Sequence, residues 1–158
     1  MRPEEILRAI PVEPAESEVL LRDWRWLVPE GFRLLCVTRI GDGFLEAPDR
    51  SIWWLDAGSA EFVPVARDRE DWLERIREPG VLDEWSAGVL VEKLESELSP
   101  AGDGQCFTYL QCPILGGTYE PSNFKLVSLH EHFGIWGPIH ERLRDLPDGT
   151  AVSFEIVD

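Results

Sequence analysis

The chain has 158 residues, of which 44% are apolar and seven are tryptophan, so we expect one folded domain with a packed core. Thirty acidic residues outnumber fifteen basic ones and give a net charge of −15. Because binding to nucleic acid or to an anionic membrane depends on Lys and Arg, this charge argues against both functions. A basic protein partner remains open, as does an acidic surface that serves only to keep the protein in solution.

The excess of acids is concentrated in residues 41–119, which carry sixteen acids and six bases, a net charge of −10. Three cysteines, an odd number, argue against a disulfide framework and indicate a reducing compartment. No run approaches the ~18 apolar residues of a membrane helix, and the N-terminus has no apolar stretch of signal-peptide length. We therefore expect a cytoplasmic protein.

The first forty residues predict two helices and a strand. Pro3 to Ile10 could form a short helix that Pro11 ends, and Glu16 to Leu27 has the apolar spacing of a second helix. Phe32 to Ile40 is an almost continuous apolar run, which is typical of a buried strand. Residues 1–39 are thus expected to be a helical extension that leads into the first strand.

The middle of the chain predicts an antiparallel meander followed by helices. Turns rich in Gly, Asp and Pro separate short strands at Phe44-Leu45, Ser51 to Leu55 and Glu61 to Ala66. Asp68 is placed to cap a helix that runs through Ile76. The apolar spacing of residues 81–98 predicts one further continuous helix.

The last third predicts a strand, a turn, a short strand and an amphipathic helix. Residues 105–110 and 124–127 suit the two strands, and Gly116-Gly117 supplies the turn. Ser128 followed by Glu131 forms a capping box, and Pro138 should kink or restart the helix that follows. Residues 150–157 alternate like a closing strand.

These elements predict an α+β fold in which helices flank a mostly antiparallel sheet. We expect one domain over residues 1–158. Its parts would be the extension and first strand at 1–39, a central unit at 40–147, and a closing strand within 148–158.

Candidate metal ligands exist, but their spacing argues against a metal site. His130 and His132 are two apart and would diverge on a helix. Cys106 and Cys112 are six apart, unlike the ligands of a zinc knuckle. We therefore expect no metal and no cofactor, and we interpret His140 as a packing residue.

Nothing in the sequence predicts an enzyme. Gly116-Gly117 could cradle a phosphate, but no Lys-Ser/Thr pair follows it as in a P-loop. No Ser-His or Cys-His pair has the context of a nucleophile. Acid pairs such as Glu70-Asp71 fall on predicted helices, where a solvated face explains them.

Trp53-Trp54 is the most informative pair for binding. Neighbours on a strand face opposite sides, so one tryptophan should enter the core and the other should be exposed among Glu46, Asp49 and Asp56. An aromatic residue surrounded by acids is typical of a protein-binding anchor. The alternative is a second packing layer over that face. These five residues are the candidate partner-binding site.

Five motifs in order resemble the C-terminal domain of type VI secretion immunity proteins that neutralise DNase effectors, which is related in plan to the SUKH immunity group. They are Gly41-Asp-Gly-Phe-Leu45, Ile52-Trp-Trp-Leu-Asp56, Gln105-Cys-Phe107 to Pro113-Ile-Leu-Gly-Gly117, Glu120-Pro-Ser-Asn123 with Val127-x-Leu129, and Gly137-Pro-Ile-His140. The resemblance covers residues 40–147.

The resemblance implies an α+β protein without catalytic activity that binds a cognate toxin, expected to be a nuclease, in the cytoplasm and blocks it. The negative charge agrees, because an inhibitor that covers a basic nuclease surface gains from complementary charge. Two alternatives remain. One is an interaction module of the same fold with another partner. The other is a small-molecule-binding protein or enzyme with a polar pocket beneath Gly116-Gly117 and an inward-facing His140.

Overall fold

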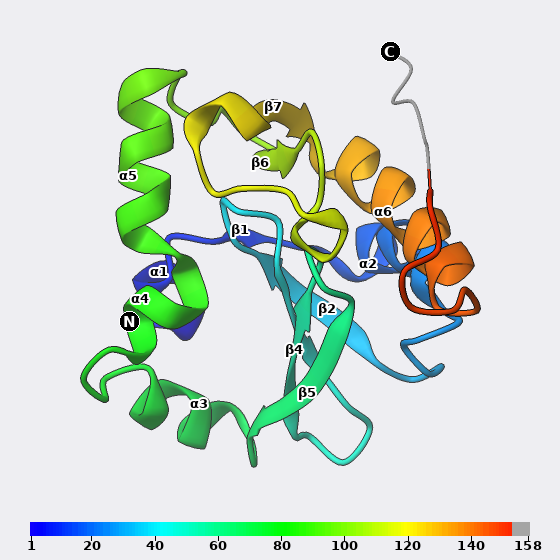
Figure 1. The fold of residues 1–158 in the computed structure, drawn as a ribbon. Coiled ribbons are helices and arrows are strands. Elements are labelled where there is room, and N and C mark those ends of the chain that lie inside the picture. The colour runs from blue at the N-terminus through cyan, green and yellow to red at the C-terminus, as the bar shows by residue number, and fades with distance from the viewer. Residues whose placement is uncertain (153–158) are drawn as a thin grey trace.

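The computed structural model describes residues 1–152 and confirms the α+β class, with a five-stranded antiparallel sheet between helices (Figure 1). The helices are α1 (Pro3–Ile6), α2 (Pro14–Leu21), α3 (Arg69–Arg75), α4 (Val81–Ser86), α5 (Gly88–Glu97) and α6 (Leu129–Leu143), with 3-10 turns η1 (Arg22–Trp24), η2 (Pro113–Leu115) and η3 (Pro121–Asn123). The strands are β1 (Ile10–Pro11), β2 (Arg33–Val37), β3 (Gly43–Glu46), β4 (Ile52–Asp56), β5 (Glu61–Ala66), β6 (Gln105–Tyr109) and β7 (Phe124–Ser128).

The large sheet is the meander that the turns predict. Its strands lie in the order β1-β2-β3-β4-β5, and each neighbouring pair is antiparallel. β1 was not predicted, because the first helix was expected to reach Ile10. The helix instead ends at Ile6, and Arg8 adopts a left-handed φ of 56°, after which Ile10 pairs with Val37.

A second sheet consists of β6 and β7, paired antiparallel from Gln105 opposite Ser128 to Tyr109 opposite Phe124. It is connected to the first sheet by a hydrogen bond of 2.7 Å from the Phe107 amide to the Arg39 carbonyl. α6 begins directly after β7, so the second sheet fixes where this helix starts.

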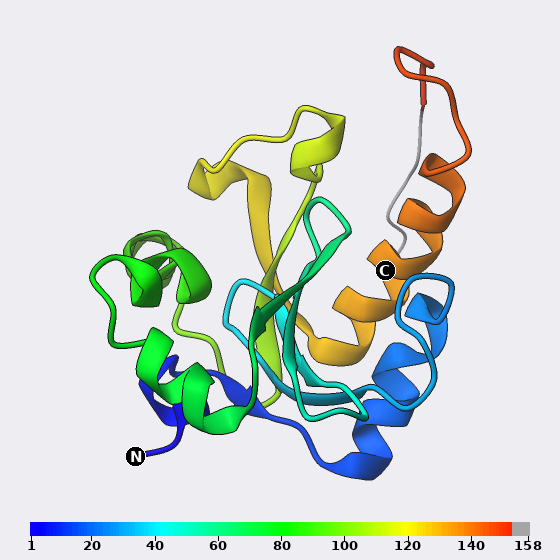
Figure 2. The ribbon, with the colours of Figure 1, turned by 90° about the horizontal axis from the view of Figure 1, so that it is seen from below.

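Apolar residues fill both faces of the large sheet. Figures 1 and 2 show α2 and α6 on one side and α1, α3 and α4 on the other. The core beneath α2 and α6 includes Leu21, Trp24 and Phe133, so the N-terminal extension packs into the same core as α6. The core on the other side includes Phe44 and Trp72.

Both predicted helix caps are confirmed. The Asp68 carboxylate accepts a hydrogen bond of 2.8 Å from the Asp71 amide at the start of α3, and the Ser128 hydroxyl accepts one of 3.1 Å from the Glu131 amide at the start of α6. α6 continues through Pro138 as one helix, so no restart occurs there.

Two expected helices differ from prediction. Residues 81–98 form α4 and α5 rather than one helix, because Ala87 between them adopts a left-handed φ of 52°. The Asp83 carboxylate accepts a hydrogen bond of 2.9 Å from the Val89 amide and so caps α5 after the break. The helix expected over 16–27 ends at Leu21 and continues as η1.

Most of the strand expected over 150–157 lies outside the described residues, and residues 150–152 are not in a strand. No helix in residues 1–152 is both long enough and apolar enough to cross a membrane.

Candidate functional site

The predicted site is built on the β3–β4 hairpin, and both of its tryptophans are half-buried. Trp53 packs against Phe32 and Phe62, with ring centroids 5.4 and 4.9 Å apart. Trp54 stacks on Phe44 at 6.1 Å on the opposite face. The expectation of one core and one exposed tryptophan is therefore wrong, because aromatic neighbours partly cover each face.

The Glu46 carboxylate is paired with a base of the same molecule. Its carboxylate accepts hydrogen bonds of 2.8 and 3.2 Å from the Arg69 guanidinium at the start of α3. This bidentate contact raises the pKa of Arg69. The pair fastens the hairpin to α3 and leaves little uncompensated charge at Glu46.

Asp49 is exposed and organises the hairpin turn. Its carboxylate accepts hydrogen bonds from the Ser51 hydroxyl at 2.6 Å and from the Ser51 amide at 3.0 Å, which lower the pKa of Asp49. The Trp53 indole donates in turn to the Ser51 hydroxyl at 2.9 Å. The structure thus links Asp49 to Trp53 through one serine.

Asp56 lies at the other end of β4, opposite Glu61, where its carboxylate accepts a hydrogen bond of 2.9 Å from the Gly58 amide. The strand register places Glu46, Trp54 and Asp56 on one face of the sheet and Trp53 on the other. The five predicted residues therefore occupy two faces and two ends of the hairpin rather than one ring.

The sequence reasoning missed Asp42, a buried carboxyl beside this hairpin. It accepts a hydrogen bond of 3.2 Å from the Ala57 amide. Burial, and then the neighbouring Asp56 carboxylate, raise the pKa of Asp42 well above its usual value. The sequence predicts a turn at Gly41-Asp-Gly43, and a turn pattern alone indicates a solvated acid.

A buried polar chain joins the two sheets to α6, and we call Gly41, Thr108, His132 and Trp136 the hub. Trp136 Nε1 donates to the Thr108 hydroxyl at 2.8 Å, and His132 Nδ1 is 2.8 Å from the same hydroxyl. His132 Nε2 is 2.9 Å from the Gly41 carbonyl. Since a carbonyl can only accept, Nε2 carries the proton and Nδ1 accepts from Thr108.

Burial agrees with this neutral tautomer, because it lowers the pKa of His132 to about 4. Gly41 has a φ of 89°, and a Cβ there would collide with the His132 imidazole. The hub is a structural unit whose hydrogen bonds are complete without a ligand.

His140 is the packing residue that the sequence predicted. It is buried beside Trp24, with ring centroids 5.8 Å apart, and its Nε2 donates to the Ala57 carbonyl at 2.8 Å. Burial lowers the pKa of His140. Within residues 1–152 no group of three His, Cys, Asp or Glu side chains is placed to hold a metal.

Gly116 and Gly117 form a tight turn. Gly116 has a φ of 91°, and a side chain on Gly117 would collide with the Gln111 carbonyl. Two hollows in the described structure lie elsewhere, one between α1, α4 and α5 and one beside Glu46 and Arg69.

The comparison with protein families decides the resemblance. Residues 66–140 match the family described as "T6SS immunity protein Tdi1, C-terminal". The expected resemblance to the C-terminal domain of a type VI secretion immunity protein is thus confirmed for this segment. The Tdi1-matching segment runs from the end of β5 into α6 and contains both α4–α5 and most of the hub.

A solved structure, described as "Crystal structure of Atu4351 from Agrobacterium tumefaciens", superposes on 80% of this chain with a TM-score of 0.53 and 13% identity. This chain covers 65% of that chain's length. At this identity the superposition supports the fold alone. No curated protein matches the sequence.

Proposed function

We propose that this protein is an immunity protein that binds a cognate type VI secretion toxin and neutralises it stoichiometrically. The family match over residues 66–140 carries the proposal. The histidines at 132 and 140 are buried and hydrogen-bonded within the fold, so neither is placed to act on a substrate. Neutralisation would then depend on contact and not on chemistry.

We further propose that the toxin is a nuclease and that it is blocked at its basic surface in the cytoplasm. A protein that grips DNA needs Lys and Arg on its surface, and this chain carries a net charge of −15. Complementary charge would speed their association and would disfavour partners that are not basic.

The hairpin is the first candidate contact for the toxin. Asp49 is exposed, whereas Glu46 and Asp56 each have a partner within the molecule. Glu46, Asp49 and Asp56 would contribute charge, Asp49 most of it, and the half-buried Trp53 and Trp54 would contribute aromatic surface on opposite faces of the hairpin. Charge reversal at the three acids should then lower the association rate and its dependence on salt.

The deciding experiment is co-expression with the product of the neighbouring open reading frame. Growth should fail with that product alone and recover when this chain is present, and the two should co-purify as a complex. The toxicity of the product alone is measured first, because growth in the presence of a harmless product would not test rescue. A product that is harmless and does not bind would overturn the proposed function.

A further inference from the structure

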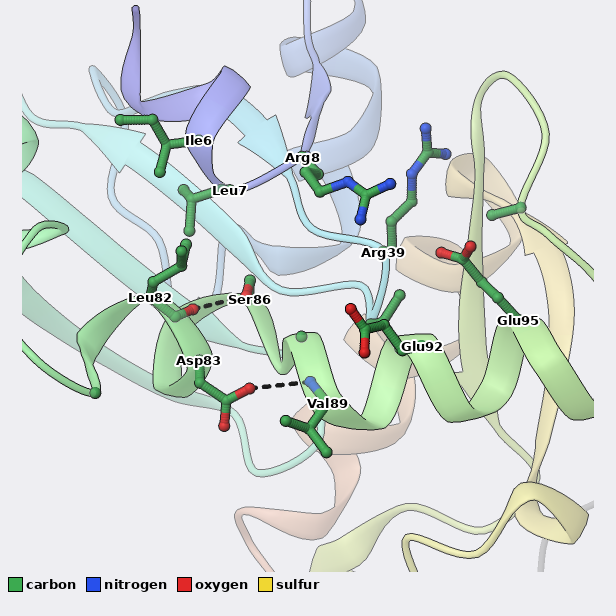
Figure 3. Close-up of a pocket in the computed structure, with 14 residues that line it drawn as sticks. Ile6, Leu7, Arg8, Arg39, Leu82, Asp83, Ser86, Val89, Glu92 and Glu95 are labelled. Atoms are coloured by element: carbon green, nitrogen blue, oxygen red, sulfur yellow. Dashed lines mark hydrogen bonds between the residues drawn. The ribbon is translucent and has the colours of Figure 1, made fainter.

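A cleft of about 570 Å³ separates α1 from α4 and α5 (Figure 3). Its apolar lining comes from both sides and includes Ile6, Leu7, Leu82, Val89 and Val91. The volume suits a large side chain or a short peptide segment better than it suits a single water. The cleft is distinct from the hairpin site.

Apolar side chains remain exposed at the mouth of the cleft. Val89 is 72% exposed and Leu82 is 38% exposed. The left-handed Ala87 produces this arrangement, since it breaks the helix between them and the Asp83 cap then fixes the first turn of α5. Leu82 and Val89 lie beside the apolar lining of the cleft, so an apolar side chain bound there would remove part of both from water.

The two helices α4 and α5 also carry a strong negative charge. Residues 81–97 hold five acids and one base, and the acids are Asp83, Glu84, Glu92, Glu95 and Glu97. Within the described residues none of these acids forms an ion pair. Glu92 and Glu95 extend toward the cleft from α5, which Figure 3 shows.

The opposite wall carries Arg8 and Arg39. Arg39 is already engaged, because its guanidinium donates to the Gly102 carbonyl at 3.0 Å and to the Gln105 carbonyl at 3.1 Å. Arg8 is exposed, and the three acids that line the cleft, Asp83, Glu92 and Glu95, outnumber its two bases.

We propose that this cleft receives a basic segment of the cognate toxin, with an apolar side chain inserted beside Val89 and flanking Lys or Arg residues against Glu92 and Glu95. The inference rests on the proposed function. A buried apolar anchor would slow dissociation, whereas the surrounding acids would speed association.

The anchor is tested with Val89→Asp in the full chain, using the purified product of the neighbouring open reading frame as the probe. Val19→Asp on α2 is the matched control, because Val19 is also a helical valine and is 42% exposed. We expect about 10- to 100-fold weaker binding for Val89→Asp, mainly through faster dissociation, and less than about a twofold change for the control.

The charge contribution is tested with the double variant Glu92→Lys/Glu95→Lys. Its control is Glu141→Lys/Asp145→Lys, which changes net charge equally beside α6, on the other side of the molecule in Figures 1 and 2. The α5 variant should associate about tenfold more slowly at low salt and depend less on salt, and the control should change much less.

The outcomes separate the two proposals. If the wild-type chain does not bind the neighbouring product, the proposed function fails and this inference fails with it. If the wild-type chain binds but Val89→Asp matches Val19→Asp, and the two double variants match one another, only the cleft is wrong. Thermal unfolding of each variant verifies that the chain remains folded.

Discussion

The segment that matches the immunity family contains most of the hub and all of α4 and α5, and these two regions use their polar groups in opposite ways. In the hub, Thr108, His132 and Trp136 satisfy one another in the interior. On α4 and α5, the acids face solvent without partners of opposite charge among the described residues, and Val89 is exposed beside them. The first region is complete as it stands, and the second is suited to a partner.

This contrast explains what the family match can support. The hub binds β6, α6 and the Gly41 turn together, so similarity in this region specifies the fold. α4 and α5 form an outer layer, and their charge can change without disturbing the hub. A partner is therefore better inferred from the α4–α5 surface than from the match itself.

The largest expected effect comes from Thr108→Val, which removes the central hydroxyl of the hub. The Nδ1 atom of His132 would lose its hydrogen-bond donor, and the Trp136 indole N–H would lose the hydroxyl that accepts from it. Thr108 is fully buried, so water cannot replace either hydrogen bond. We expect the free energy of unfolding to fall by about 2–4 kcal/mol in urea denaturation.

Thr108→Ser is the control, because it keeps the hydroxyl and removes one methyl group, at about 1 kcal/mol. Folded Thr108→Val should still bind the toxin with unchanged affinity, since the hub does not reach the cleft. Equal destabilisation by Val and Ser would show that the hydrogen bonds contribute little.

Much of the fold follows from local sequence. Alternating and continuous apolar runs located β2 to β7, and Asp68 and Ser128 marked where α3 and α6 begin. These features depend on neighbours in sequence, so a single sequence contains the information. The break at Ala87 was missed because α4 and α5 share one apolar stripe, and alanine gives no sign of a left-handed φ.

The candidate site was harder to predict, because it depends on long-range contacts. The pairing of Glu46 with Arg69, and the aromatic layer of Phe32 and Phe62 over Trp53, join residues that are far apart in sequence. The cleft combines α1 with α4 and α5, so no local pattern could have located it.

The next effect concerns pH and again separates the hub from the surface. Burial holds the pKa of His132 at about 4 in the folded chain, against about 6.5 when unfolded. Between these values the unfolded chain binds a proton that the folded chain does not. Stability should therefore fall as pH decreases, by about 1–2 kcal/mol from pH 7 to pH 5.

The buried His140 contributes in the same direction, because burial also lowers its pKa. Asp71, whose pKa is lowered to about 2 chiefly by the Arg67 amide, loses its contribution only at more acidic pH, below about 3.8. Denaturation curves of His132→Gln should show a weaker dependence over this range than those of His130→Gln, a change at an exposed histidine. Identical pH slopes would exclude His132 as the cause.

The smallest effect is at Asp83, which has a role in both the fold and the cleft. Its carboxylate caps α5 through the Val89 amide at 2.9 Å and also lines the cleft. Asp83→Ala should lower the free energy of unfolding by about 0.5–1 kcal/mol, whereas Asp83→Asn keeps an acceptor oxygen and should remain within a few tenths of a kcal/mol of the wild type. Both variants remove one negative charge, so both should slow toxin association slightly and equally. If Asp83→Ala instead weakens toxin binding much more than Asp83→Asn does, the loss of binding would follow the loss of the cap and not the loss of charge. The position of Val89 would then depend on the first turn of α5, and the cap would control the shape of the cleft.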